Sequence, residues 1–207
     1  MKLYYAETLS HRKACAVARY LESPVEYVRV DLGAGAQYRP PFLALNPNGK
    51  VPVLETAGRT IWEADAIMCH LAREAGSELW PGDERQVEVI RWLSWGAQHF
   101  NRHAGSLYFE YLIKGPFGLG SPDAAKVEEA QGQVRKYAAV LDEHLKGRRW
   151  LVGETPSIAD FAVAIALPYA EEAHIPVEDL AEVRRWHDRL CAFPAGRAPS
   201  PAPAPAA

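Results

Sequence analysis

The sequence lacks the features of membrane, secreted and nucleic-acid-binding proteins. None of its apolar runs approaches the roughly 20 residues that a membrane-spanning helix needs. The N-terminal segment MKLYYAETLS has no apolar signal-peptide core, so we expect a cytoplasmic protein that is not bound to a membrane. The net charge is only −3, without the basic excess of a nucleic-acid-binding protein. We therefore expect neither a nucleic acid nor a membrane as a partner.

Cysteine is scarce as well. The three cysteines, Cys15, Cys69 and Cys191, are far apart and form no C-x-x-C pair, which is typical of reduced intracellular thiols. Cys15 lies between apolar positions of a predicted helix, so we interpret it as a core residue and not as a nucleophile. What the sequence does contain, 48% hydrophobic and 24% charged residues over 207 positions, favours two compact globular units.

The N-terminal third alternates between predicted strands and helices. The apolar patterns predict, in order, a strand at 2–6, a helix at 10–21, a strand at 27–30, a helical turn at 42–45, strands at 51–54 and 60–62, and a helix after Glu63. Between the last two strands, residues 56–59 read as a hairpin connection. The resulting order is β-α-β-α-β-β-α.

From Asp83 onward the sequence offers only helices. A long helical pattern runs from there to about Ile113, and a second one follows Asp123. Ser157 with Asp160 three residues later resembles a capping box at the start of another helix. We expect an all-helical domain over residues 85–194, after a first domain at 1–76 and a linker at 77–84. Residues 195–207, almost all Ala and Pro, read as a tail.

Two motifs together resemble a known family. NPNGKVPVL followed by IWEADAIMCH, in residues 46–70, is similar to the glutathione-binding signature of the cytosolic glutathione transferases, and we take the chain to be of the bacterial type. TPSIADF, in residues 155–161, is similar to the N-capped core helix of the helical domain in that family. The resemblance implies an α/β thioredoxin-like domain followed by an all-α domain.

The resemblance also implies how glutathione would be held. Val51 and a cis Pro52 would present backbone groups to its cysteinyl part, and Lys50 would meet its glycine carboxylate. The γ-glutamyl carboxylate would lie at Glu63 and Ala64, where the next helix begins. Ala64 replaces the serine of the family motif, but the first amides of a helix favour an anion whatever the side chain. Glutathione would be the co-substrate.

The resemblance places the thiol-activating hydroxyl in the loop before the first helix. Two residues fit: Ser10, where one bacterial class keeps a cysteine, and Thr8, followed by Lys13 as in another class. The sequence favours Ser10 narrowly over Thr8. Either hydroxyl also fits a simple helix cap, which is the usual role of Ser or Thr at such a position.

A second substrate would lie against the first long helix. We expect Trp95, His99, His103 and Tyr108 to line its pocket. His99 and His103 have the i, i+4 spacing with which two imidazoles share a metal. No glutamate follows His99 and no third ligand is evident, so we expect no metal.

These expectations describe a detoxifying glutathione transferase, in which glutathione attacks a small apolar electrophile that the sequence does not identify. A glutathione-dependent disulfide reductase or isomerase, and a non-catalytic glutathione-binding protein, remain alternatives. The resemblance further implies a homodimer formed through residues 64–74 and 83–113. These segments carry more apolar residues than two single-sided helices need, among them Met68, Cys69, Trp92 and Trp95.

Overall fold

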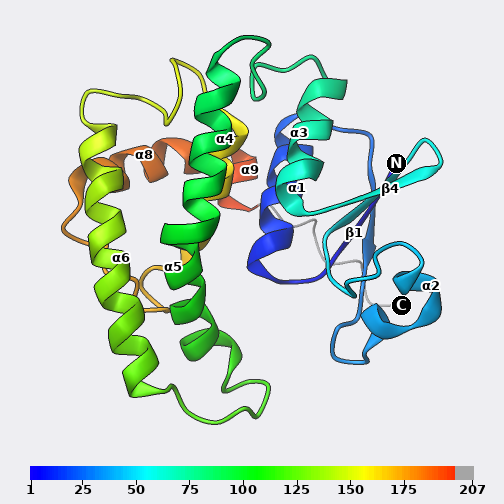
Figure 1. Ribbon diagram of the computed structural model, residues 1–207, viewed down its shortest axis with the longest axis horizontal. Helices are drawn as coiled ribbons and strands as arrows, with labels where there is room; N and C mark the ends of the chain where they lie inside the picture. Colours follow the sequence, from blue (N-terminus) through cyan, green and yellow to red (C-terminus); the bar gives the residue numbers. More distant parts are fainter. Residues whose placement is uncertain (199–207) are drawn as a thin grey trace. The chain divides into compact units, whose positions relative to one another are not determined.

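The computed structural model describes residues 1–198 and divides them into two compact units (Figure 1). Of the described residues, unit 1 contains 1–77 and 193–198, and unit 2 contains Glu78–Ala192. Of the predicted tail, residues 195–197 lie in a short helix, and residues 199–207 lie outside the described part of the chain. Within residues 1–198, no helix has the length and apolar character that crossing a bilayer requires.

Unit 1 is a four-stranded mixed sheet with helices on both faces. Its elements are β1 (Lys2–Tyr5), α1 (Leu9–Tyr20), β2 (Glu26–Arg29), the 3₁₀ turn η1 (Ala36–Tyr38), α2 (Pro40–Leu43), β3 (Val53–Thr56), β4 (Arg59–Trp62), α3 (Ala64–Glu74) and α9 (Pro194–Arg197). Up to α3, this confirms the order β-α-β-α-β-β-α.

The strand order β2-β1-β3-β4 brings three chain segments to one end of the sheet. β1 runs parallel to β2 and antiparallel to β3, and β3 and β4 form a hairpin. Tyr4 lies opposite Val53, and Val53 lies opposite Trp62. The loop that follows β1, the residues that precede β3 and the residues that follow β4 therefore all leave the sheet at the same end.

The β3–β4 hairpin closes through a two-residue turn, and this corrects the predicted strand. Ala57 and Gly58 have φ of 45° and 74°, as a type I′ turn requires. The sequence predicted a strand at 51–54 and a connection at 56–59, whereas β3 begins at Val53 and both Thr56 and Arg59 belong to strands. The shift has two reasons: Pro52 has no N–H for the ladder, and the tight turn needs only two residues.

Each face of the sheet has its own core. α1 and α3 lie side by side over one face (Figure 1), which buries Leu3 and Leu54. On the opposite face Phe42 of α2 packs with Val53, and its ring lies edge-on to Tyr4, with centroids 6.2 Å apart. The alternation of adjacent residues between these faces is the two-residue period of a strand.

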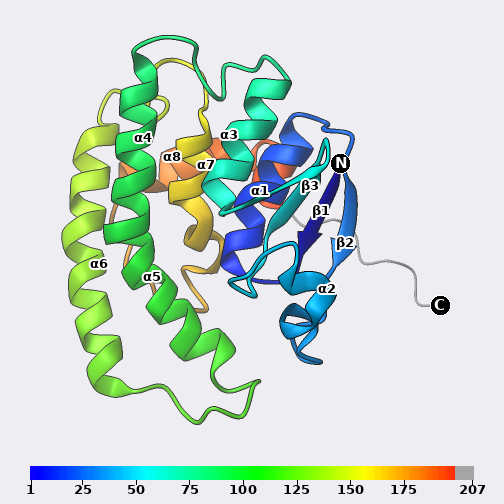
Figure 2. The same ribbon diagram turned by 45° about the vertical axis from the view of Figure 1, so that its right-hand side comes forward.

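Unit 2 is all-helical, as predicted. It contains α4 (Arg85–Trp95), η2 (Gly96–Phe100), α5 (Asn101–Tyr108), η3 (Phe109–Ile113), α6 (Ala124–Leu145), α7 (Ile158–Val163), the 3₁₀ segment η4 (Ala164–Tyr169) and α8 (Ala181–Cys191). The first four segments form one continuous helix beside α6 (Figure 2), and η2 and η3 are π-helical turns within it. The long helical pattern to Ile113 is thereby confirmed.

The first π-helical turn lies where the long helix presses against α7. A Cβ added to Gly96 would stand 3.0 Å from Cγ2 of Val163, a closer approach than ordinary packing allows. One turn later, Asn101 donates from its side-chain amide to the Ala162 carbonyl at 2.9 Å. Gly96 and the Asn101 hydrogen bond together permit this close contact between the long helix and α7. The π-helical turn accommodates one residue more than an α-helical turn would.

The centre of unit 2 contains a buried carboxylate, that of Asp160. It closes the predicted capping box, accepting from the Ser157 N–H at 2.8 Å and hydroxyl at 3.0 Å. Its other oxygen accepts from the Leu151 N–H at 2.9 Å and from Trp186 Nε1 at 2.8 Å. Burial raises the pKa of this carboxyl, and the four donors oppose that shift. Asp160 therefore ties α7 to α8 and to the loop before α7.

Candidate active site

The turn before β3 exposes backbone groups at Val51. The Val51–Pro52 peptide bond is cis, as the sequence predicted. The hydrogen-bonded pairing of β3 with β1 ends at Val53. The Val51 peptide group therefore lies outside this ladder. Two hydrogen bonds of the Asn46 side chain stabilise the turn: its amide donates to the Lys50 carbonyl at 2.7 Å, and its Oδ1 accepts from the Asn48 N–H at 3.0 Å. The Lys50 side chain extends outward and is exposed.

α3 begins directly after β4 with an unusual backbone. Glu63, the residue before the helix, has φ of 72°, which is uncommon for a residue other than glycine. Its side chain is exposed and forms no capping bond, and Ala64 is buried. The first amides of an α-helix have no partner within the helix. This end of the sheet therefore offers unpaired donors and the positive end of a helix dipole to an anion.

The loop after β1 places Thr8 and Ser10 in different environments. Thr8 is the N-cap of α1: its buried side-chain oxygen faces the His11 N–H in a capping box, and its hydroxyl proton has no acceptor among the described residues. Ser10, at the second helical position, is exposed. The sequence did not distinguish these two environments, because both hydroxyls precede the same apolar pattern.

His11 is a site residue that the sequence analysis missed. Its ring is buried beside Tyr5, and its Nδ1 accepts the Thr8 N–H at 2.8 Å. Burial lowers the pKa of His11 to about 4, so the ring is neutral at pH 7. With Nδ1 as an acceptor, the proton lies on Nε2. The available signal was its position three residues after the N-cap, where the reciprocal capping residue stands.

We predict that His11 makes the protein less stable in mild acid. Its pKa rises from about 4 in the folded state to about 6.5 when unfolded, so the unfolded chain takes up a proton first as pH falls. The His11 contribution is complete above pH ~6.5 and is lost as pH falls to ~4, amounting to about 3 kcal/mol. His11→Gln keeps a capping side chain and removes the titration. Urea unfolding at pH 7 and pH 4.5 should show a smaller pH dependence for His11→Gln than for the wild type, and equal dependences would refute the assignment.

An ion pair joins the N-terminal halves of α1 and α3. Lys13 Nζ lies 2.9 Å from Asp65 Oδ1, and the two side chains are 13% and 31% exposed. Lys13 is five residues beyond Thr8, and Asp65 is next to Ala64. The contact therefore holds the two helix starts near each other, at the same end of the sheet where Val51 lies.

Cys15 behaves as predicted for a core residue. It is fully buried within α1, and burial raises the pKa of its thiol to about 12. The thiolate is the nucleophilic form of cysteine, so Cys15 is unsuited to attack a substrate at neutral pH.

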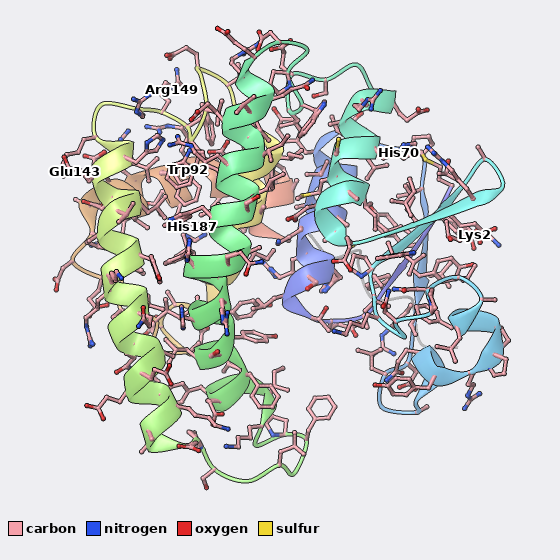
Figure 3. All side chains as sticks on the ribbon, viewed as in Figure 1. Lys2, His70, Trp92, Glu143, Arg149 and His187 are labelled. Atoms are coloured by element: carbon pink, nitrogen blue, oxygen red, sulfur yellow. The ribbon has the colours of Figure 1, made fainter. Side chains whose placement is uncertain are left out.

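The four residues predicted for the second-substrate pocket do not lie together. Trp95, His99 and His103 share one face of the long helix and contact Tyr137 of α6, with ring centroids 6.3, 4.8 and 5.9 Å from the Tyr137 ring. Tyr108 instead packs on Tyr169 at 4.9 Å. Neighbouring Trp92 (Figure 3) contacts Trp95 at 4.9 Å and His144 at 4.4 Å. Tyr137, which joins three of these rings, was not identified from the sequence.

Metal-binding side chains do not gather anywhere in residues 1–198. No three His, Cys, Asp or Glu residues of that range approach closely enough to share an ion. His99 and His103 instead stack on the Tyr137 ring.

Known proteins match both units. The family model "Glutathione S-transferase, N-terminal domain" matches residues 1–73, and "Glutathione S-transferase, C-terminal domain" matches residues 100–194. Glutathione S-transferase 3 of Zea mays is 34% identical over 177 residues, 82% of this chain and 79% of that protein. The disulfide-bond oxidoreductase YfcG of Escherichia coli is 28% identical over 209 residues, 93% of this chain and 91% of that protein.

A solved structure is similar throughout. A glutathione transferase from Burkholderia graminis, with two glutathione molecules bound per subunit, has a TM-score of 0.82 and 26% identity. The match covers 96% of this chain and 86% of that one.

Proposed function

Because this chain belongs to the glutathione S-transferase family, we propose that it binds glutathione in unit 1 and activates its thiol to attack a small apolar electrophile. The observation that carries the proposal is the meeting of three features at one end of the sheet. Tyr4, Val53 and Trp62 are aligned across β1, β3 and β4. The cis-proline turn, the start of α3 and the Thr8 loop extend from these positions.

In this proposal the tripeptide is held mainly by backbone groups. The Val51 peptide pairs with the cysteinyl backbone of glutathione, and Pro52 keeps that peptide turned outward. The γ-glutamyl carboxylate lies at the amides that open α3, beside Glu63 and Ala64. The exposed ammonium group of Lys50 meets the glycine carboxylate. Because the backbone amides of α3 bind the γ-glutamyl carboxylate, the lack of a hydroxyl at Ala64 removes one hydrogen bond. The electrostatic attraction of the helix N-terminus remains.

For thiol activation we favour Thr8 over Ser10, reversing the narrow preference from sequence. A buried hydroxyl whose proton has no acceptor gains the most from donating to a thiolate, since leaving that donor unpaired costs about 1–3 kcal/mol, and its oxygen can still accept the His11 N–H of the capping box. Ser10 is exposed and can bond to water instead. Neutral His11 fixes the Thr8 backbone through the 2.8 Å bond. The N-terminus of α1 adds its dipole, which also favours a thiolate.

For the second substrate we retain Tyr108 and set aside Trp95, His99 and His103. The latter three are engaged by Tyr137, which accounts for their aromatic surface within unit 2. Tyr108 lies on a different face of the long helix, where its ring packs on Tyr169.

A glutathione-dependent disulfide reductase is the second candidate. The relative from Escherichia coli that matches 93% of this chain is a disulfide-bond oxidoreductase, so the same scaffold serves that chemistry. The purified protein should be assayed with glutathione and chlorodinitrobenzene, and separately with glutathione and hydroxyethyl disulfide. Faster conjugation supports the transferase, and faster reduction supports the reductase. Retention on immobilised glutathione without either turnover would indicate a binding protein.

We also propose a homodimer through residues 64–74 and 83–113. The prediction that these segments carry surplus apolar residues was partly wrong, because Met68 and Trp92 are buried within the single chain. The surface of α4 nevertheless exposes Val87 and Ile90, at 68% and 51%. Two branched apolar side chains one turn apart on an exposed helix face are typical of a contact surface.

The dimer is tested by charging that surface. Val87→Glu with Ile90→Glu should convert a dimer into a monomer in light scattering at micromolar concentration, without unfolding, since both side chains are exposed. Leu119→Glu, at a position 57% exposed and outside both segments, is the matched control and should stay dimeric. A wild-type mass equal to one chain would refute the proposal.

A further inference from the structure

Unit 2 contains a large cavity that the proposed glutathione chemistry does not use. Its volume is about 620 Å³, within the range of small-molecule sites. Its walls come from α6, η4, the loop at 170–178 and α8. None of its lining residues belongs to unit 1 or to the segments proposed for the dimer.

The floor of this cavity is apolar. Leu167, Ile175, Val177 and Val183 line it, and each is at least nine-tenths buried. These side chains favour an apolar ligand body, since contact with it would remove further apolar surface from water.

The rim is charged and predominantly negative. Glu171, Glu178 and Asp188 contribute three carboxylates, all exposed, and none of them forms a salt bridge within residues 1–198. Among the described residues, Arg184 is the one guanidinium that lines the cavity, and it donates to the Glu178 backbone carbonyl at 3.3 Å. Two histidines, His174 and His187, also belong to the lining, and His187 is labelled in Figure 3. The rim therefore has more negative than positive charge.

His174 gives the rim a backbone feature of its own. The Ile175 N–H bonds to the Ala170 carbonyl and the His174 N–H to the Glu171 carbonyl, which is the Schellman pattern at a helix end. His174 occupies the left-handed position, φ 50°, where glycine is preferred. Its ring lies 4.5 Å from that of Tyr111, so the side chain keeps a fixed place at the cavity edge.

We propose that this cavity binds a small organic cation, an amine with an apolar body. The body would lie on the floor, and the ammonium group would lie among Glu171, Glu178 and Asp188. An anion of the same shape would be repelled by the excess of carboxylates. The cavity shares no lining residue with unit 1, where glutathione is proposed to bind, and the proposal does not depend on the transferase activity.

Three probes with one apolar body test the head-group preference. 4-Phenylbutylamine, 4-phenylbutanol and 4-phenylbutanoate should be titrated by calorimetry into the full-length protein. We expect the amine to bind with a dissociation constant on the order of 100 µM, a reasonable affinity for so small a ligand. The alcohol should bind several-fold more weakly and the carboxylate weakest. Equal affinity for amine and carboxylate, or no binding of the amine at millimolar concentration, would overturn the proposal.

Variants locate the bound amine. Glu171→Gln with Glu178→Gln should weaken the amine about fivefold, as expected for the loss of two exposed charge contacts, and should leave the alcohol unchanged. Glu172→Gln changes an exposed neighbour that does not line the cavity, and should have no effect. Saturating glutathione should leave amine binding intact. Displacement by glutathione, or an unchanged affinity in the double variant, would place the amine elsewhere and refute the site.

Discussion

Asp160→Ala is expected to lower the free energy of unfolding of unit 2 by about 3–5 kcal/mol. The substitution leaves four donors in the core without their acceptor: the N–H and hydroxyl of Ser157, the Leu151 N–H and Trp186 Nε1. Each buried donor left unpaired costs about 1–3 kcal/mol, partly relieved by local rearrangement or water. The loss is comparable with the whole stability of many domains.

Asp160→Asn separates the charge from the hydrogen bonds. Its oxygen can still accept from Leu151 and Trp186, but its amide would face the Ser157 N–H, donor against donor. We expect a loss of about 1–3 kcal/mol, smaller than for alanine. Asp179→Ala, an exposed site in the same unit, is the control and should stay within 0.5 kcal/mol of wild type, about the usual limit for surface changes. Guanidinium unfolding measures all three, and equal losses for Asp160→Ala and Asp179→Ala would contradict the role of the buried carboxylate.

Thr8→Ala is expected to reduce glutathione conjugation at neutral pH by about 10- to 100-fold. A hydrogen bond to a charged group contributes about 1.5–3 kcal/mol, and the buried Thr8 hydroxyl is the donor proposed for the thiolate. The rate should partly recover as pH rises, because the thiol then ionises without help. Loss of the cap should also cost about 1 kcal/mol of stability.

Two further variants separate these effects. Thr8→Ser keeps the hydroxyl and should retain most of the activity, whereas Ser10→Ala removes an exposed hydroxyl and should change the rate little. Steady-state rates across pH 6–9 distinguish them. A large loss in Ser10→Ala with little loss in Thr8→Ala would return the role to Ser10.

The order of elements could be predicted because it depends on local patterns. Alternation in β1 and helical spacing in α1 are visible in short windows, and the Val51–Pro52 turn has a recognisable motif. The first strand of the hairpin was predicted two residues early because Pro52 fits the apolar pattern but has no N–H for the ladder. The connection was predicted too long because its I′ turn uses Ala57 at positive φ, a position where Asn, Asp or Gly is the usual signal.

The grouping of side chains was harder to predict because it depends on depth and on neighbouring helices. Thr8 and Ser10 look equivalent in the sequence, and only the path of the loop after β1 buries one and exposes the other. In the long helix, Trp95 and Tyr108 are thirteen residues apart, about 1300° of rotation in a regular helix, which puts them on different faces. The π-helical turns at Gly96 and Phe109 alter that rotation further, so a simple helical wheel could not assign the faces.

The most direct test of the account is the pKa of the glutathione thiol when it is bound to this protein, read from the ultraviolet absorbance of the thiolate during a pH titration. We predict a value at least one unit below that of the free thiol, whose pKa is about 8.5, and a rise towards the free value in Thr8→Ala. Bound glutathione that titrates like free glutathione in the wild-type protein would contradict thiol activation. It would leave unit 1 as a glutathione-binding domain without the proposed chemistry.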